Sequence, residues 1–288
     1  MWNDRRVIVA GGTAGFGLVL ARRLSAAGAR VLLVGRSGEG VRSAIAACEA
    51  SALGGGRDAA PRLHGITADL ARPGEGGRVV GEGLRIFGGV DDLFFCVGRS
   101  GRARILSSGV EDLREFLDAN LATAVEITQA AADEIAAARG HMVYIGSLAG
   151  KLVTPSMGPY AIAKSALAAY VDAVRLEMAP RGAHVLLVSP GPIRRDDDDP
   201  RAADAADRYA DAVLRSGLPA EALRPGGGAA VRPIDPEWLA ERVLAACRRR
   251  TSELVVPRSA GLLAGLIEWF PDRGRRLLAR FAGRRSDG

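Results

Sequence analysis

Short apolar runs alternate with longer alanine-rich stretches of helical period along most of this chain. The apolar runs cover residues 7–10, 31–34, 63–67, 93–97, 142–145 and 185–188. Strands separated by helices pair in parallel, because each helix carries the chain back to the same end of the sheet. Runs that are apolar throughout indicate strands covered on both faces. The pattern therefore predicts an α/β fold, with a doubly wound parallel sheet and helices on both of its faces.

The length and composition of the chain fit one large domain followed by a short tail. The 288 residues are 48% hydrophobic, which is enough for a single sizeable core. We predict a single domain over residues 1–257 and a basic segment over residues 258–288. The first apolar run begins at Val7 without a charged-then-apolar leader, and no uninterrupted apolar stretch of membrane-spanning length occurs. We therefore expect a cytoplasmic protein.

The cysteines and histidines form neither a metal-binding nor a disulfide pattern. The cysteines are odd in number and far apart, and the histidines form no cluster; these residues are Cys48, Cys96, Cys247, His64, His141 and His184. Isolated cysteines suit a reducing compartment, and no metal-ligand spacing links them to the histidines. We therefore expect no metal site.

The excess of positive charge is concentrated near the end of the chain. Residues 242–288 hold eleven arginines against four acidic residues, whereas the rest of the chain is nearly balanced. A nucleic-acid-binding protein more often spreads arginine along a groove with interleaved aromatic residues. The charge distribution therefore argues against nucleic acid as a partner.

A glycine-rich turn follows the first apolar run, and an amphipathic helix follows the turn. The turn reads Gly11-Gly12-Thr13-Ala14-Gly15-Phe16-Gly17. Glycines permit a tight turn and close approach of the backbone to a pyrophosphate, while the helix N-terminus offers N–H groups and positive potential. A glycine string alone occurs in many turns. Its position between strand and helix favours dinucleotide binding and a Rossmann-type sheet.

A tyrosine and a lysine lie at helical spacing. Only two lysines occur in the chain, Lys151 and Lys164, and the second lies four residues after Tyr160. Positions i and i+4 share a helix face, so phenol and ammonium would face the same cleft, and the cation would lower the pKa of the tyrosine. Ser147, thirteen residues before the tyrosine, could then hold a substrate oxygen. The pair alone also arises by chance in many helices.

Together these motifs resemble the short-chain dehydrogenase/reductase family. The family's glycine fingerprint corresponds to the turn described above, and its Tyr-x-x-x-Lys pair to Tyr160 and Lys164. Its catalytic serine and asparagine match Ser147 and Asn120. The resemblance implies that Tyr160 is general acid or base, that Lys164 lowers its pKa and binds the nicotinamide ribose, and that Ser147 orients the carbonyl oxygen. It also implies that Asn120 supports a proton-relay water.

The resemblance spans roughly residues 5–257 and also implies which residues hold a dinucleotide. They are Gly11, Thr13, Ala14, Gly15, Phe16, Gly17, Arg36, Ser37, Asp69, Leu70, Cys96, Val97, Gly98, Pro190, Gly191 and Ile193, together with Tyr160 and Lys164. Of these, Asp69 would bind the adenine amino group or cap a helix, and the alternatives are compatible. The backbone of Ile193 would contact the nicotinamide carboxamide.

The end of the second predicted strand indicates which dinucleotide to expect. An acidic residue there binds a ribose 2′-hydroxyl, whereas an arginine accepts a 2′-phosphate. This chain has Arg36 followed by Ser37, with no Asp or Glu at that turn. A guanidinium is a planar fork that suits phosphate, so NADP(H) is favoured and NAD(H) is the alternative. The alternative interpretation of Arg36 is a solvated surface side chain that contacts neither nucleotide.

Two segments depart from the family pattern. The family's Asn-Asn-Ala-Gly after the fourth strand reads Phe-Cys-Val-Gly at residues 95–98, so only the glycine is retained. We expect altered sheet packing beside the adenosine rather than loss of binding. Arg195 replaces the threonine usual after the Pro-Gly turn, where the family contacts a cofactor phosphate or carboxamide.

In the family the segment after the sixth strand closes over the substrate, so residues of about 194–232 are expected to form a lid. Four consecutive carboxylates, residues 196–199, are interpreted as a solvated turn and helix start rather than a ligand site. Leu148, Val153 and Met157 near the tyrosine indicate an apolar pocket wall.

The tail combines apolar residues at helical spacing with a basic face. The apolar residues are Leu262, Leu263, Leu266, Ile267, Phe270, Leu277, Leu278 and Phe281, with Pro271 as a break. Most amphipathic helices bury such a stripe in protein, so packing on the domain or on a second subunit is favoured. The alternative is an anionic membrane surface, which binds basic amphipathic segments.

The predicted function is NADP(H)-dependent reduction of a small-molecule carbonyl, or oxidation of the corresponding secondary alcohol, with a tyrosine general acid/base. One alternative, resting on the tail alone, is a membrane-associated reductase of a ketosphingoid or ketoacyl lipid. Another is a non-catalytic protein that senses dinucleotides, although such a protein needs no proton donor beside the nicotinamide. The resemblance also implies a homodimer or homotetramer, paired through helices over residues 112–138 and 158–179. Peripheral contact with the inner membrane surface is the alternative to a purely cytoplasmic location.

Overall fold

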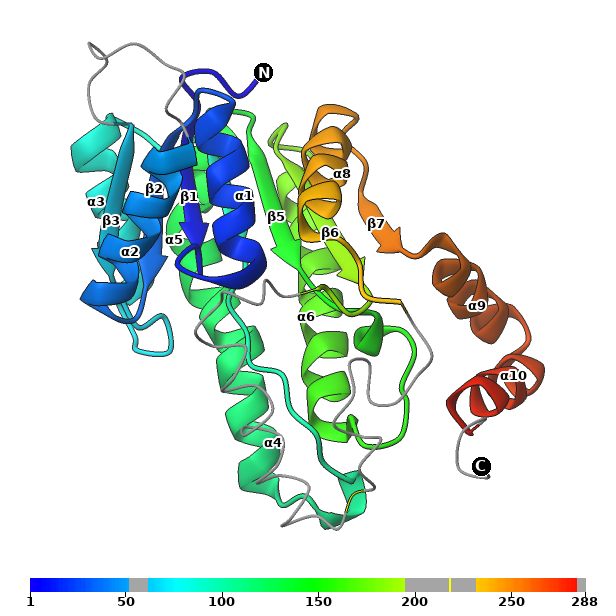
Figure 1. Ribbon diagram of the computed structural model, residues 1–288. Coiled ribbons are helices and arrows are strands. Elements are labelled where there is room, and N and C mark those ends of the chain that lie inside the picture. Colours follow the sequence, from blue (N-terminus) through cyan, green and yellow to red (C-terminus); the bar gives the residue numbers. More distant parts are fainter. Residues whose placement is uncertain (52–61, 195–217, 219–231, 284–288) are drawn as a thin grey trace.

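A computed structural model of the chain describes residues 1–51, 62–194, 218 and 232–283. The described residues form a seven-stranded sheet in the order β3-β2-β1-β4-β5-β6-β7, with every neighbouring pair parallel (Figure 1). The strands are β1 Arg6–Ala10, β2 Arg30–Gly35, β3 Leu63–Thr67, β4 Asp92–Phe95, β5 His141–Ile145, β6 His184–Pro190 and β7 Glu253–Val256. The predicted doubly wound parallel sheet is confirmed.

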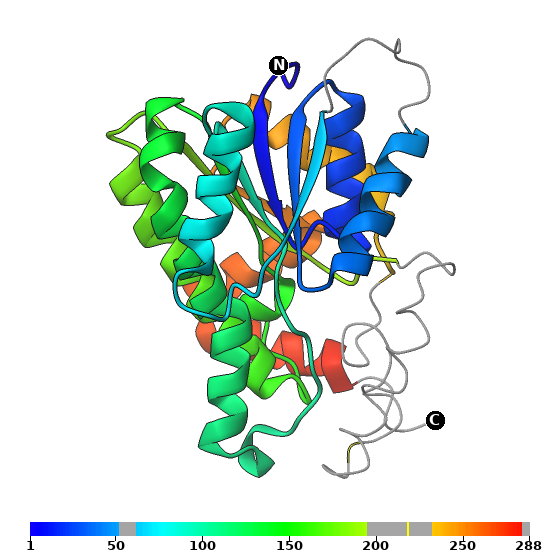
Figure 2. The same ribbon diagram turned by 90° about the vertical axis from the view of Figure 1, so that its left-hand side faces the viewer.

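Helices cover both faces of the sheet (Figure 2). One layer contains α1 (Gly15–Ala26), α2 (Gly38–Ser51) and α8 (Pro236–Arg248), and the other contains α3 (Glu75–Phe87), α5 (Thr123–Ala137) and α6 (Gly158–Met178). Alternate residues of a strand serve opposite layers, so Val7 and Val9 of β1 pack in the first, whereas Ile8 and Ala10 pack in the second. Apolar runs without alternation are therefore what a sheet covered on both faces requires.

The strand β7 corresponds to none of the six predicted runs. It has four residues, starts with Glu253, and only Val256 is fully buried. A run this short carries almost no periodic signal, so the sequence pattern misses it. Pairing with β6 makes it a strand, because its backbone continues the ladder up to the pair Pro190 and Val256.

The helix before β5 contains a wider turn that periodicity does not predict. The helix α4 (Val110–Leu117) continues through a π-helical segment, Asp118–Ala122, into α5. The predicted single helix over residues 112–138 is therefore one connected rod with an inserted bulge. Bulges of this kind often occur at functional sites, because the extra residue changes the direction in which side chains point. Here the bulge contains Asn120.

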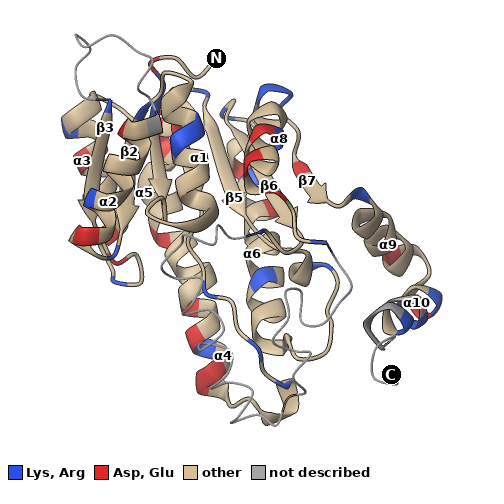
Figure 3. Cartoon of the chain, viewed as in Figure 1, with Lys and Arg blue, Asp and Glu red and all other residues tan. Residues whose placement is uncertain are grey.

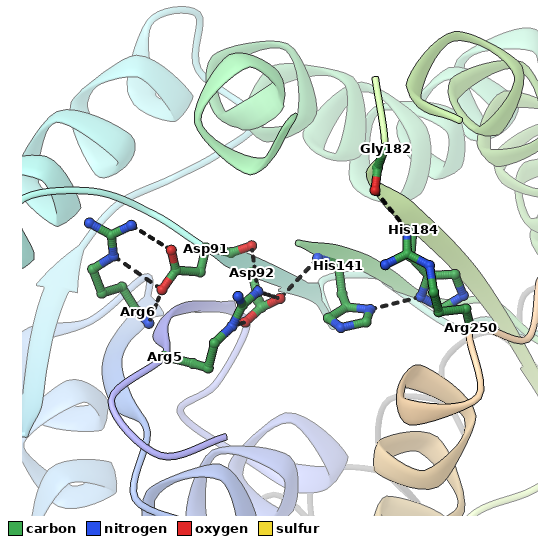
Figure 4. Close-up of polar contacts among 8 residues, drawn as sticks. All are labelled: Arg5, Arg6, Asp91, Asp92, His141, Gly182, His184 and Arg250. Atoms are coloured by element: carbon green, nitrogen blue, oxygen red, sulfur yellow. Dashed lines mark hydrogen bonds and ion pairs between the residues drawn. The ribbon is translucent and has the colours of Figure 1, made fainter. Parts of the chain in front are cut away.

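Charged and histidine side chains link the amino ends of the central strands, at the opposite end of the sheet from the glycine turn (Figure 4). The guanidinium of Arg5 donates two hydrogen bonds to the buried carboxylate of Asp92, at 2.8 and 2.6 Å. The same carboxylate accepts the backbone N–H of His141 at 2.9 Å. His141 and His184 meet through their Nδ1 atoms at 2.8 Å. These contacts join the segment before β1 to β4, β5 and β6.

The last two helices, α9 (Arg258–Trp269) and α10 (Pro271–Gly283), lie beyond β7 at one side of the molecule (Figure 1). Of the apolar stripe expected in this segment, most residues are half-buried, and Leu262 and Phe270 are exposed; the half-buried ones are Leu263, Leu266, Ile267, Leu277 and Leu278. The described part of the chain contains no helix long and apolar enough to cross a membrane.

Candidate functional site

Residues singled out from the sequence gather at the carboxyl ends of the parallel strands. The order of the strands reverses between β1 and β4, where β2 and β3 lie on one side and β5 to β7 on the other. Open α/β sheets bind ligands in the crevice outside the strand ends at such a point. The glycine turn follows β1, Cys96 follows β4, Ser147 follows β5 and Pro190 ends β6.

The glycine turn is a place where backbone segments approach closely. Gly11 has a φ of +79°, and a Cβ there would lie 3.0 Å from the carbonyl carbon of Cys96. A Cβ on Gly17 would lie 2.2 Å from the carbonyl oxygen of Gly11, so a side chain would push α1 away from the turn. Gly15 has a φ of +51°, and no described atom lies within 4 Å of its Cβ position. The turn therefore presents open backbone in front of the helix.

The first turn of α1 presents uncapped N–H groups to that opening. Ala14 is the N-cap residue and has no side-chain acceptor, and the first turn contains no acidic residue. Uncapped N–H groups together with the helix dipole attract an anion. The backbone of Thr13 to Gly17 therefore fits the pyrophosphate of a dinucleotide.

The end of β2 lies directly beside the glycine turn. A Cβ on Gly35 would lie 2.4 Å from the Cγ2 atom of Thr13, so the threonine packs over this glycine. The next residues, Arg36 and Ser37, are exposed, and the Ser37 hydroxyl accepts the N–H of Gly40 at 3.1 Å. The exposed guanidinium is thus carried by the strand end that adjoins the pyrophosphate cradle.

The segment after β3 clarifies one of the two interpretations of Asp69. The helix α3 begins at Glu75 with Gly74 as its N-cap, so the proposed helix cap by Asp69 is wrong. Its Oδ1 instead accepts the N–H of Ala71 at 3.2 Å and closes a local turn, while Leu70 is buried in the core. The contact of Asp69 with adenine stays a prediction.

Cys96 and Val97 lie in the loop after β4 and not in the strand that was predicted to include them. Cys96 donates its N–H to the carbonyl of Ala10 at 2.8 Å. A Cβ on Gly17 would lie 3.1 Å from the Cβ of Cys96, so the cysteine packs against the glycine turn. Burial raises the pKa of its thiol to about 12, opposed by the charge of Lys164, and the thiol is therefore neutral.

Gly98, the glycine retained from the family pattern, lies beside two functional side chains. A Cβ on Gly98 would lie 2.6 Å from Oδ1 of Asn120 and 3.0 Å from Nζ of Lys164. A side chain at this position would displace one or both. The glycine therefore allows an amide oxygen and an ammonium to lie close together over the loop.

Asn120 is held rigidly by the π-helical bulge. It is fully buried, and its Nδ2 donates to the carbonyl oxygens of Arg99 at 3.0 Å and Phe116 at 2.9 Å. Its Oδ1 is also buried and has no hydrogen-bond partner among the described residues. A buried amide oxygen generally has a partner, so an acceptor beside an ammonium fits an ordered water or a bound hydroxyl.

Lys164 is a buried cation at the centre of the site. It is 5% exposed, and its ammonium donates to the carbonyl of Ile145 at 3.2 Å. Burial lowers its pKa to about 8, and the neighbouring Cys96 opposes the shift. Such a lysine keeps its proton at neutral pH, although burial weakens its hold on that proton.

Tyr160 lies in the first turn of α6, and Lys164 follows one turn later. The tyrosine packs against a small apolar cluster that includes Ala149 and Met157. The N–H of Ala149 donates to Oγ of Ser147 at 3.1 Å. Ser147 and Tyr160 therefore both contact Ala149 in the short helical turn Leu148–Gly150, and both are half-exposed.

The loop after β6 is joined to the sheet edge. Gly191 donates its N–H to the carbonyl of Val256 at 2.7 Å, and Ile193 pairs with Ile234. Both Gly191 and Ile193 are half-buried beside the other strand ends. Arg195, residues 196–199 and most of the expected lid lie outside the described residues.

The sequence reasoning did not assign a role to Lys151, the other lysine. Its ammonium forms an ion pair with Glu253 at 2.9 Å, and the same carboxylate oxygen accepts the hydroxyl of Ser189 at 3.1 Å. The ion pair ties the segment after Ser147 to β6 and β7. Its signal in the sequence was the rarity of lysine, since both lysines of this arginine-rich chain lie near the candidate site.

Comparison with known proteins agrees with this arrangement. Residues 5–205 match the sequence profile of the family described as short chain dehydrogenase. The chain belongs to the short-chain dehydrogenase/reductase family. A solved structure, a short-chain dehydrogenase from Streptomyces avermitilis, superimposes with a TM-score of 0.74 at 21% identity. That superposition covers 99% of this chain and 100% of the other, and it supports the fold.

Other members of the short-chain dehydrogenase/reductase family share part of their sequence with this one. The chain is 33% identical over 193 residues to dehydrogenase/reductase SDR family member 7B of Danio rerio, covering 67% of this chain and 62% of that protein. It is 30% identical over 193 residues to an uncharacterized oxidoreductase of Mycobacterium tuberculosis, covering 66% and 70%. The match thus spans less than two thirds of the Danio rerio relative.

Proposed function

We propose that the protein is an NADP(H)-dependent oxidoreductase that reduces a carbonyl to a secondary alcohol or catalyses the reverse oxidation. The observation that carries the proposal is that Oδ1 of Asn120 and Nζ of Lys164 both lie beside Gly98. Tyr160 lies one helical turn before Lys164, and Ser147 follows β5. A dinucleotide placed across the glycine turn would supply hydride to the carbonyl carbon. The substrate is a small molecule, and nothing in the charge pattern favours nucleic acid.

The protein's own residues would manage the proton and the carbonyl oxygen. Ser147 donates a hydrogen bond to that oxygen, and the phenol of Tyr160 donates the proton that completes the alcohol. The buried ammonium of Lys164 favours the phenolate left behind. The unpartnered Oδ1 of Asn120 holds a water through which the proton is replaced.

The test of this function is Tyr160→Phe, which removes the proton donor and keeps the ring. We expect kcat for reduction of ketone substrates to fall by at least about a hundredfold, while NADPH binding is retained. The matched control is Tyr170→Phe, since Tyr170 lies farther along the same helix. Unchanged turnover in Tyr160→Phe would remove Tyr160 from the mechanism. A wild type that binds NADPH but turns over no ketone or alcohol would favour the dinucleotide-sensing alternative.

The preference for NADP(H) rests on Arg36, which is exposed beside the pyrophosphate cradle. The substitution Arg36→Asp places a carboxylate where NADPH would carry its 2′-phosphate, so we expect NADPH affinity to fall at least about tenfold and NADH affinity to hold or rise. Fluorescence titration of both nucleotides measures this, and Arg248→Asp, at the exposed end of α8, is the control. Equal loss of both nucleotides would contradict a phosphate contact.

We also propose a homodimer or homotetramer in the cytoplasm. Ile162 and Leu176 are exposed on α6, one of the helices that the family resemblance assigns to subunit pairing. Light scattering after size-exclusion chromatography measures the assembly, and Leu176→Asp is expected to lower the mass by disrupting that face. A monomeric wild type would reject the assembly. The free cysteines Cys48, Cys96 and Cys247 are compatible with a reducing compartment.

A further inference from the structure

The first helix of the C-terminal hairpin (residues 258–283) is α9, and it carries an exposed apolar face. Leu262 is 77% exposed and Trp269 is 82% exposed, and their spacing of seven residues places both on the same side of α9. Phe270, directly after the helix, is 54% exposed. A large aromatic side chain with most of its surface in water is unusual in a helix that already has a neighbour to pack on.

The second helix carries a row of arginines. Arg273, Arg276 and Arg280 are exposed, and their spacing places them on one side of α10. Gly274 is buried, and a Cβ there would lie 2.7 Å from the Cα of Ile267, so this side of α10 faces α9. On a helix that advances about 100° per residue, the three arginines lie roughly 100–160° away from Gly274. The arginines therefore lie on sides of α10 that do not face α9. Figure 3 shows the basic residues of α10 in blue.

The hairpin is attached to the domain through small residues. A Cβ on Gly261 would lie 3.4 Å from the side chain of Val255, so this glycine faces β7. Leu262 is the next residue, about 100° further round the helix, and it points away from that contact. One side of α9 and one side of α10 are therefore packed through these glycines. The apolar face of α9 and the arginines of α10 stay exposed to solvent.

We propose that the C-terminal hairpin binds the surface of an anionic phospholipid membrane. Leu262, Trp269 and Phe270 enter the boundary between headgroups and acyl chains, where tryptophan is favoured because its ring is apolar and its N–H is polar. The arginines of α10 bind the lipid phosphates. The helix α9 has 12 residues, or about 18 Å, and lies in the plane of the surface.

Charge complementarity favours a membrane over a second copy of this chain. A twofold interface places the same patch of each subunit against its counterpart, so two arginine-bearing hairpins would bring like charges together. The two helices carry the acidic residues Glu268 and Asp272 against five arginines, at positions 258, 273, 275, 276 and 280. An anionic lipid surface neutralises the row formed by Arg273, Arg276 and Arg280 and covers the apolar residues at the same time.

Co-sedimentation of the purified full-length protein with lipid vesicles tests the proposal. We expect binding to vesicles that contain phosphatidylglycerol, weak or no binding to phosphatidylcholine alone, and weaker binding at high salt because the charges are screened. Tryptophan emission is expected to shift to the blue on binding. The shift is expected to vanish in Trp269→Ala.

Matched variants separate the hairpin from the rest of the surface. Trp269→Ala and the double variant Arg276→Gln/Arg280→Gln are each expected to lower the vesicle partition coefficient at least about tenfold. The controls are Trp238→Ala on α8, where the tryptophan is 46% exposed, and Arg248→Gln/Arg249→Gln, whose arginines are exposed near the end of that helix. Both controls are expected to bind like the wild type.

Three results would overturn the proposal. They are failure of the wild type to bind phosphatidylglycerol vesicles, equal binding to both lipids, and equal losses in the control variants. If Trp269→Ala lowers the mass in light scattering and no vesicle binding occurs, the apolar face is an interface between copies. Because the hairpin contains none of Asn120, Ser147, Tyr160 and Lys164, ketone reduction in these variants reports on the proposed reaction separately.

Discussion

Gly98 controls the distance between two side chains that come from distant parts of the chain. The neighbouring family positions have changed to Cys96 and Val97, yet the glycine is present, and the structure supplies the reason. A Cβ would meet both Oδ1 of Asn120 and Nζ of Lys164. The requirement is therefore steric and local to the site. Of the two side chains before it, Cys96 packs against the glycine turn and Val97 against the core.

For Gly98→Ala we expect kcat/KM to fall at least about tenfold, because displacement of a catalytic group by as little as one ångström weakens catalysis. The fold should survive, since the loop lies beyond the carboxyl end of β4 and outside the sheet. Steady-state kinetics with NADPH and a reducible ketone measure the effect. Gly81→Ala on α3 is the control, as no described atom lies within 4 Å of its Cβ position. Full activity in Gly98→Ala would show that Asn120 and Lys164 accommodate the added methyl group without loss of catalysis.

The burial of Lys164 has a cost in stability that is measurable apart from catalysis. Its pKa falls from an ordinary 10.5 to about 8 because burial disfavours the charge. At neutral pH we expect the unfolding free energy of Lys164→Met to be about 2 kcal/mol higher than that of the wild type. We expect the variant to lose ketone reduction. Urea denaturation measures the difference, and a less stable variant would contradict it.

The same lysine makes the folding stability of the wild type depend on pH in the alkaline range. Between about pH 8 and 10.5 the unfolded chain holds a proton that the folded chain has released, so folding stability rises with pH across this window. In Lys164→Met this contribution is absent. The difference in unfolding free energy between the two proteins should therefore shrink as the pH rises, and a constant difference would show that Lys164 is not desolvated.

The helices α3 and α5 meet at Gly76. The helical pattern of the sequence does not distinguish this glycine from its neighbour Gly77. A Cβ on Gly76 would lie 2.4 Å from the carbonyl oxygen of Glu126, whereas no described atom lies within 4 Å of the corresponding position on Gly77. Gly76 therefore sets the separation of two helices. Gly77 contributes only backbone freedom.

Two alanine substitutions on α3 should consequently have opposite signs. Gly76→Ala forces the helices apart and is expected to lower the unfolding free energy by about 1–3 kcal/mol. Gly77→Ala is expected to raise it by about 0.5–1 kcal/mol, because alanine is the better helix former. Chemical denaturation followed by circular dichroism measures both, and equal effects would reject the close contact.

At the level of the fold, the histidine pair joins the strands at the end of the sheet away from the site. The carbonyl of Thr251 can only accept, so Nε2 of His184 carries a proton in its 2.8 Å contact with that oxygen. Nδ1 of a neutral His184 then accepts from Nδ1 of His141 at 2.8 Å. Burial lowers the pKa of His141 to about 3, with repulsion from His184, Arg5 and Arg250 adding to the effect.

Acid should therefore destabilise the whole domain through this pair. Between about pH 6.5 and 3 the unfolded chain binds a proton that folded His141 rejects, so stability falls as the pH falls. Trp2 packs against the ring, the charge of Arg5 acts on it, and Asp92 accepts the backbone N–H of His141; all three remain in the variant. In His141→Gln the loss between about pH 7.5 and 5 should be smaller by about 2 kcal/mol, measured by urea denaturation. An unchanged loss would assign the acid sensitivity to other groups.

Features that depend on neighbours in the sequence could be predicted without the structure. The glycine turn, the apolar runs and the four-residue spacing of Tyr160 and Lys164 are local patterns, because backbone freedom, strand burial and helix faces are set over a few residues. These patterns predicted a sheet of parallel strands. They also pointed to the short-chain dehydrogenase/reductase family.

Other features depend on contacts between segments far apart in the chain, and only the packed fold establishes them. The meeting of Gly98 with Asn120 and Lys164, the pairing of β7 with β6 and the ion pair of Lys151 with Glu253 are of this kind. The amphipathic pattern of the tail likewise predicts a helix but not what covers it. Which groups approach, and which faces stay exposed, follows from the close packing of the whole chain, to which distant residues contribute together.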